Sequence, residues 1–203
     1  TTWLQEIFSL IVSEGDLTPV LTLQGFKRIP WLEAKQNETF VANLSSPRAF
    51  MSHMPYELMP STFFSSKAKV IYLARNPKDV VVSQFYFHQT ISFLPDPGTF
   101  EEFTDGFLKG NVMYGKWTDH VKSWRNADLG DRILYITYEE MLQDLRGIIE
   151  RISRFLNWQL SEEALKQVIE RSQLKTMKQR KMSNSSLVSQ KIPDNMRPLH
   201  LRK

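Results

Sequence analysis

The sequence predicts an α/β fold in which helices flank a central parallel sheet. Two short apolar runs, at 69–74 and 132–138, have the length and the β-branched and aromatic content of buried strands. Segments with helical spacing of apolar residues come before, between and after these runs, and such alternation is typical of a parallel sheet with helices on its faces. At 203 residues the chain is long enough for one domain with a sizeable core.

The first helix is predicted at residues 1–13. Leu4, Ile7 and Ile11 recur at the spacing of one helical face. Gly15 follows closely, and glycine is the residue that most easily adopts the left-handed turn at the end of a helix. We therefore expect the helix to end just before Gly15.

The longest helical pattern covers residues 139–156. Its apolar residues form one stripe of the kind that packs on a protein core, so one continuous helix is expected. The other expected elements are a short helix within the loop 18–46, a short strand at 48–53, helices at 77–88, 100–109, 115–124 and 161–171, and a loop from residue 182 onward. No composition shift or repeat marks a boundary, so we expect a single domain over residues 1–203.

The junction after the first predicted strand carries the strongest functional signal. Arg75 follows the strand directly. Asn76 and Pro77 are typical of a helix start, and Ser83 lies two turns into that helix. Open α/β sheets bind ligands at the carboxyl ends of strands, where an arginine fork and a hydroxyl suit a phosphate group. The alternative from these residues alone is an arginine that pairs with a surface carboxylate.

Composition narrows the classes of function. The formal net charge is +4 at pH 7, an excess that fits an anionic small molecule as well as nucleic acid. Aromatic residues do not alternate with basic ones as they do in single-strand binders, so we expect no nucleic-acid partner. The chain has no cysteine and its four histidines lack ligand-like spacing, so neither disulfides nor a metal site is expected. The apolar runs are too short to span a bilayer, so no membrane partner is expected either.

The segment 67–83 resembles the 3′-phosphate-binding segment of the cytosolic sulfotransferases. Further stretches match that family in the same order along the chain, at 1–7, 52–55, 107–112 with 115–117, 136–141, 182–184 and 201–203. The resemblance implies the P-loop-NTPase-like sulfotransferase fold. It also implies transfer of a sulfuryl group from 3′-phosphoadenosine 5′-phosphosulfate (PAPS) to a small-molecule hydroxyl acceptor, with 3′-phosphoadenosine 5′-phosphate (PAP) as the second product and no metal.

The resemblance also implies roles for individual residues. His53 matches the general base that takes the proton of the acceptor hydroxyl. The cofactor-binding positions that it implies are Thr1, Thr2, Trp3, Arg75, Ser83, Tyr138, Ser172, Leu174, Met177, Leu201, Arg202 and Lys203. The residues expected to line an apolar acceptor pocket are Phe26, Trp31, Phe85 and Phe87.

The segments at 30–33 and 63–72 are most similar to the hydroxysteroid and alcohol branch, which makes a steroid or another apolar alcohol the expected acceptor. A phenol sulfotransferase is an alternative. Met51 argues mildly against it, because some family members have a lysine at this position. The catalytic loop lysine of the family would precede Thr1, and the C-terminal tail of the family would follow Lys203. We therefore expect a domain truncated at both ends, and a non-catalytic module that binds PAPS or PAP is a further alternative. The resemblance implies a cytoplasmic location and allows a homodimer.

Overall fold

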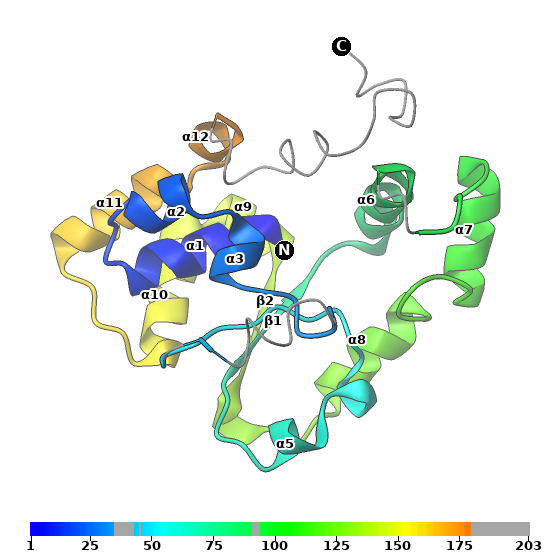
Figure 1. The fold of residues 1–203 in the computed structure, drawn as a ribbon, viewed down its shortest axis with the longest axis horizontal. Coiled ribbons are helices and arrows are strands. Elements are labelled where there is room, and N and C mark those ends of the chain that lie inside the picture. The colour runs from blue at the N-terminus through cyan, green and yellow to red at the C-terminus, as the bar shows by residue number, and fades with distance from the viewer. Residues whose placement is uncertain (35–42, 45, 91–93, 180–203) are drawn as a thin grey trace. The chain divides into compact units, whose positions relative to one another are not determined.

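The structure is a computed structural model that describes residues 1–34, 43–44, 46–90 and 94–179 (Figure 1). These residues form two compact units. The first unit comprises the described parts of 1–53, 68–73 and 131–179, and the second comprises those of 54–67 and 74–130.

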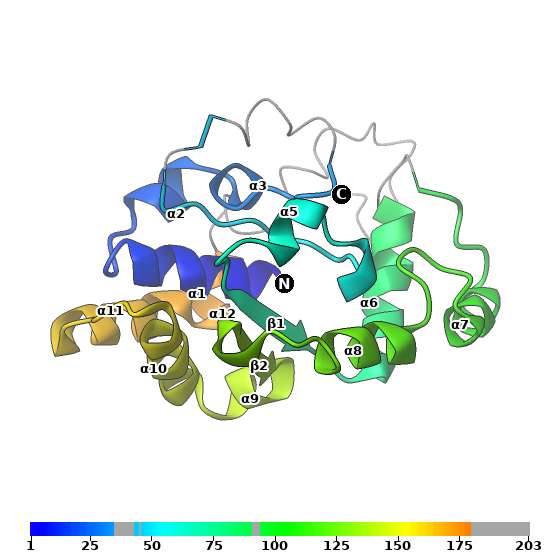
Figure 2. The same cartoon turned by 90° about the horizontal axis from the view of Figure 1, so that it is seen from below.

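Within the described residues the sheet consists of two parallel strands. Strand β1 (Val70–Ala74) pairs with β2 (Ile133–Thr137), and the chain passes directly from β2 into a helix (Figure 2). Tyr72 and Tyr135 contact each other edge to face, with their ring centroids 5.8 Å apart. Both strands lie within one residue of their predicted bounds, so the predicted α/β class with a parallel sheet is confirmed.

Helices make up most of the first unit. Their bounds are α1 (Thr2–Val12), α2 (Thr18–Thr22), α3 (Gly25–Arg28), α9 (Tyr138–Gln143), α10 (Leu145–Leu156), α11 (Glu162–Ser172) and α12 (Leu174–Lys178), and the 3₁₀ turn η3 (Gly130–Arg132) precedes β2. One short helix was expected in the loop predicted at 18–46, and the described part of that loop contains two, α2 and α3. Helix α11 begins as predicted, because the Ser161 hydroxyl caps it by accepting the Ala164 N–H at 3.1 Å.

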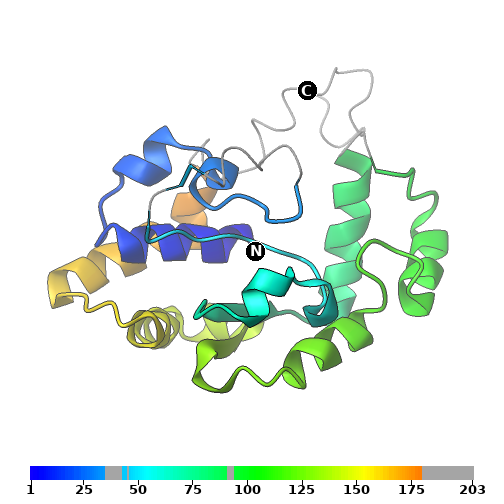
Figure 3. The same ribbon diagram turned by 60° about the horizontal axis from the view of Figure 1, so that its bottom comes forward.

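Helix α1 lies in the core of the first unit. Ile7, Leu10 and Ile11 are fully buried, and α1 packs on α10 and α11 (Figure 3). The helix ends as the sequence predicts: Gly15 has a φ of 87°, and its N–H donates to the carbonyl oxygen of Leu10 at 2.8 Å. The expected helix at 1–13 is therefore confirmed.

The polar side of α1 is buried as well. Glu6 Oε2 lies 2.7 Å from Arg28 Nη2, and the two side chains are only 1% and 6% exposed. Arg28 also donates to the Ser9 hydroxyl at 2.6 Å, while Gln5 Nε2 donates to the Ile29 carbonyl at 3.2 Å. Helix α3 and the residue after it are thereby fastened to α1 through polar contacts that an apolar stripe does not predict.

The single helix predicted at 139–156 is wrong, because Asp144 divides it. Asp144 has φ −141° and ψ 75°, outside the helical region, and α9 ends at the residue before it. Its carboxylate accepts the Gly147 N–H at 2.8 Å and so caps the start of α10. An aspartate competes well with a continuing helix because it can satisfy the backbone of a new one.

The strand predicted at 48–53 is also wrong in extent. The segment makes a single isolated parallel bridge, between Trp31 and Met51. Leu32 N–H donates to the Met51 carbonyl at 2.8 Å, and Met51 N–H donates to the Pro30 carbonyl at 2.9 Å. The pairing is too short to count as a strand, but it fixes the register of two segments about twenty residues apart.

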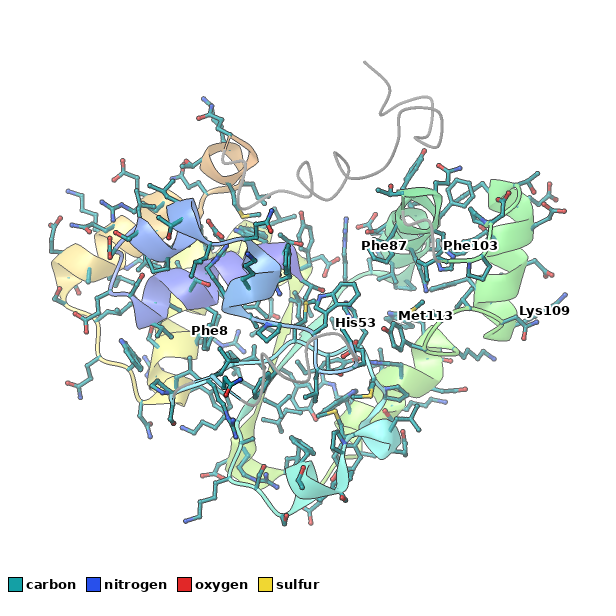
Figure 4. All side chains as sticks on the ribbon, in the orientation of Figure 1. Phe8, His53, Phe87, Phe103, Lys109 and Met113 are labelled. Carbon is teal, nitrogen blue, oxygen red and sulfur yellow. The ribbon has the colours of Figure 1, made fainter. Side chains whose placement is uncertain are left out.

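The second unit packs through aromatic residues. Its elements are η2 (Tyr56–Leu58), α5 (Ser61–Phe64), α6 (Pro77–Thr90), α7 (Phe100–Lys109) and α8 (Trp117–Arg125). Val81 and Phe85 of α6 pack against Phe103 and Phe107 of α7. Phe103 is labelled in Figure 4. Helix α7 has the predicted bounds. Helices α6 and α8 differ from their predicted bounds by at most two residues at either end.

We expect Glu6→Gln to destabilise the protein. The change keeps the side-chain volume but leaves the buried Arg28 guanidinium without its countercharge, a loss of about 3 kcal/mol in the free energy of unfolding. Urea denaturation measures this loss. As a control, Asp105→Asn removes an exposed ion pair with Lys109, and its expected effect is below about 0.5 kcal/mol. Equal small losses in both variants would contradict a structural role for the Glu6–Arg28 pair.

Candidate functional site

In the first unit, Trp3 contacts two other expected cofactor-binding residues, Ser172 and Tyr138. The Trp3 indole N–H donates to the Ser172 carbonyl at 2.7 Å. The Trp3 ring also meets the Tyr138 ring edge to face, with the centroids 5.6 Å apart and the planes at 72°. Trp3 is 6% exposed and Ser172 is fully buried, so these contacts hold the indole in one orientation.

Two more expected cofactor-binding residues belong to the same cluster. Met177 is buried in it, and Leu174 packs against it from the start of α12. The residues come from four elements that are far apart in sequence. The start of α1 thus meets the start of α9, which follows the carboxyl end of β2, and the segment from α11 into α12.

The start of α1 has the properties of an anion site. Thr1 is its N-cap residue, and the Thr1 and Thr2 side chains are exposed. Backbone N–H groups at a helix N-terminus, together with the helix dipole, attract an anion. With the Trp3 cluster beside it, this end of the first unit combines donors for an anion with an aromatic and apolar surface.

His53 and Glu33 form a second group in the first unit. Glu33 Oε1 lies 3.1 Å from His53 Nδ1 and accepts the His53 backbone N–H at 2.9 Å. The Trp31 ring meets the His53 ring edge to face at a centroid distance of 5.1 Å. The His53 side chain is 33% exposed, so its ring is both held and accessible (Figure 4).

The contact changes the acidity of Glu33. Burial by itself raises the pKa of the Glu33 carboxyl, but the hydrogen bonds from the His53 ring and backbone outweigh it and bring the pKa below its usual value. The carboxyl is therefore an ionised acceptor at neutral pH. No local sequence pattern points to Glu33, because it meets His53 only through the pairing of two segments about twenty residues apart.

Arg75 and Ser83 lie in the second unit, at the start of α6. Asn76 caps this helix as predicted, since its side chain accepts the Lys78 N–H at 3.0 Å. Arg75 Nε lies 3.6 Å from Asp79 Oδ2, which matches the carboxylate pairing considered as the alternative. That pair is half exposed and contributes about 1 kcal/mol at most, so a phosphate group could compete for Arg75. Ser83 is exposed one turn after Asp79, on the same helical face.

The four residues expected to line an acceptor pocket differ in their surroundings. Trp31 contacts His53, as described above. Phe26 on α3 is 40% exposed and Phe87 on α6 is 38% exposed, while Phe85 is buried in the aromatic core of the second unit. Of these four residues, Trp31 therefore has a described contact with His53, the expected general base.

The remaining expected cofactor-binding residues, Leu201, Arg202 and Lys203, lie outside the described residues. Among the residues that the structure does describe, no cluster of three or more histidine and acidic side chains could hold a metal ion. Across the same ranges, none of the helices is both long and apolar enough to cross a membrane.

Comparison with known proteins adds an independent line of evidence. The model of the sulfotransferase domain matches residues 1–203. Sulfotransferase 2B1 of Mus musculus is 44% identical over 203 residues, which are all of this chain and 60% of that protein. The 3-beta-hydroxysteroid sulfotransferase of Cavia porcellus is 41% identical over 188 residues, 93% of this chain and 66% of that protein.

The fold is also similar to that of a sulfotransferase of known structure. The crystal structure of mouse sulfotransferase SULT7A1 complexed with PAP superposes with a TM-score of 0.73 and 30% identity, covering 88% of this chain and 62% of that one. The chain spans less than two thirds of the length of each of these three proteins.

Proposed function

Because the chain belongs to the sulfotransferase domain family, we propose that the protein transfers a sulfuryl group from PAPS to the hydroxyl of a small apolar acceptor. The observation that carries the proposal is the Trp3 cluster, in which the Trp3 indole contacts both Tyr138 and the Ser172 carbonyl. Residues expected at an adenine subsite from three distant parts of the sequence are neighbours there, beside a helix N-terminus suited to a phosphosulfate.

Each unit, taken by itself, holds residues whose chemistry suits a part of the proposed nucleotide. In the first unit, Trp3, Tyr138, Leu174 and Met177 would contact the adenine. In the second unit, the Arg75 guanidinium and the Ser83 hydroxyl would bind the 3′-phosphate, a task for which a planar cation with several donors is suited. That mouse sulfotransferase SULT7A1 was crystallised with PAP supports this assignment. The proposed reaction involves no metal, because the sulfuryl group carries less charge than a phosphoryl group.

The proposed acceptor is a steroid or a related apolar alcohol. Similarity to a 3-beta-hydroxysteroid sulfotransferase supports this class. The Trp31 ring against His53 offers an apolar surface directly beside the proposed base, and Phe26 of the same unit is proposed as a further contact. A single domain over the whole chain, a cytoplasmic location and a homodimer belong to the same proposal.

His53 has one task in the proposed reaction. As the acceptor oxygen forms its bond to sulfur and the bond from sulfur to the PAP phosphate oxygen breaks, the imidazole takes the proton that the hydroxyl loses. The ring is suited to this task because neutral imidazole accepts protons near neutral pH. In the first unit, the N–H groups at the start of α1 would stabilise the negative charge that develops on the departing nucleotide.

Calorimetric titration of the full-length protein with PAP and with AMP tests the proposal. A clear preference for PAP, followed by transfer of labelled sulfate from PAPS to a hydroxysteroid, would support it. Transfer to simple phenols alone would favour a phenol sulfotransferase. Preference for PAP without transfer to either acceptor would favour a non-catalytic binding module, and no preference for PAP would refute the proposal.

Arg75→Ala should weaken the binding of PAP far more than the binding of AMP. Loss of a charge-assisted contact to the 3′-phosphate corresponds to about 1.5–3 kcal/mol, or roughly a 10- to 100-fold rise in the dissociation constant of PAP. Titration calorimetry measures both ligands. Arg125→Ala, at the end of α8, serves as the matched control and should leave both affinities unchanged. Equal losses for PAP and AMP would argue against a 3′-phosphate contact.

His53→Ala should lower sulfation at least about 100-fold, because the reaction loses its general base. The affinity for PAP should change little, since His53 is assigned to the acceptor and not to the nucleotide. Initial rates with labelled PAPS and a PAP titration give the two numbers, and His120→Ala is the matched control. Turnover that survives His53→Ala would show that another group accepts the proton.

A further inference from the structure

The bridge between Trp31 and Met51 determines which residues meet beyond it. In a parallel pairing, residues two positions further along each segment come to the same side. Two residues after Trp31 is Glu33, and two residues after Met51 is His53. The register of one short bridge therefore places this carboxylate beside this imidazole.

Glu33 holds His53 at two points. Its Oε1 atom accepts the His53 backbone N–H at 2.9 Å and lies 3.1 Å from Nδ1 of the same residue. The Glu33 side chain is only 15% exposed, and the Trp31 ring contacts the imidazole from another direction. The backbone N–H, the ring nitrogen Nδ1 and the ring of His53 are thus each contacted by a residue of the 31–33 segment.

The chemistry of the contact selects one tautomer of the imidazole. An ionised carboxylate can only accept hydrogen bonds, so a neutral His53 in this geometry carries its hydrogen on Nδ1. The basic lone pair then resides on Nε2. If Nδ1 bore the lone pair, it would face the carboxylate at 3.1 Å with no hydrogen between them, which is unfavourable.

We propose that Glu33 is a positioning residue for the proposed general base: it holds His53 with hydrogen on Nδ1, so that Nε2 receives the proton of the acceptor hydroxyl. The proposal rests on the sulfuryl transfer proposed above. Glu33 does not itself take up the proton. Its negative charge stabilises the imidazolium that forms when Nε2 has been protonated, as a buried aspartate does for the histidine of a Ser-His-Asp triad.

A purely structural role makes different predictions. A carboxylate that only ties the 31–33 segment to the 51–53 segment would stabilise the fold, and its loss would reduce the amount of folded protein. A positioning role requires that the folded protein still binds PAP but that its imidazole changes tautomer and its turnover falls. The tautomer and the ratio of kcat to KM therefore separate the two roles.

Nitrogen NMR of the histidine rings in full-length Glu33→Gln tests the tautomer. We expect wild-type His53 to be in the Nδ1–H form and the variant to populate the Nε2–H form, because glutamine can also donate to Nδ1. The signal missing in His53→Ala assigns the residue. His88 is an internal reference, since its Nδ1 lies 3.3 Å from the Pro95 carbonyl, which accepts in every variant. An unchanged His53 tautomer would overturn the proposal.

Steady-state kinetics with PAPS and a hydroxysteroid provide the second measurement. Glu33→Gln should lower kcat by about 10- to 100-fold, because the variant loses part of the rate enhancement that a general base provides. KM and the affinity for PAP should change less than about twofold. Glu101→Gln on the exposed side of α7 is the matched control. Full kcat in Glu33→Gln, or a loss that follows only the folded fraction, would overturn the proposal.

The two proposals fail in different ways. A wild-type protein that neither prefers PAP nor transfers sulfate would refute the proposed function, and the catalytic role of Glu33 with it. A wild-type protein that transfers sulfate, with Glu33→Gln equal to it in kcat and tautomer, would refute the role of Glu33 alone.

Discussion

The ion pair between Glu6 and Arg28 connects the core of the first unit to its candidate site. Two charges buried at 1% and 6% exposure require each other, so α3 is held against α1 in one arrangement. Two residues after Arg28 the chain enters the contacts with Met51, and these contacts bring Glu33 to His53. The geometry of the proposed base therefore depends on a buried ion pair elsewhere in the first unit.

The same helix also carries the proposed nucleotide subsite. Trp3 lies one turn before Glu6 on α1, and its indole is held by Tyr138 and the Ser172 carbonyl. Because α1 is buried on nearly all sides, its packing fixes both the Trp3 indole and the Glu6 carboxylate.

Local signals account for the elements that were predicted well. Asn76 before Pro77 and Ser161 before two glutamates place helix starts, because a capping side chain acts within three residues. Local signals also explain the failures. The apolar stripe of 139–156 continues past Asp144, so its period hides the break that the aspartate makes by capping α10. The segment at 48–53 has strand composition, but only Met51 finds a partner in the pairing described.

The sequence by itself determined the α/β class, most helix bounds and, through its resemblance to the sulfotransferases, the identity of His53, Trp3, Tyr138 and Arg75 as candidates. It could do so because strand and helix patterns and motifs are properties of neighbouring residues. Only the tertiary structure decided that Glu33 meets His53 and that Ser172 accepts from Trp3. These contacts join residues 20 and 169 positions apart, and which groups meet at that range depends on how whole elements pack.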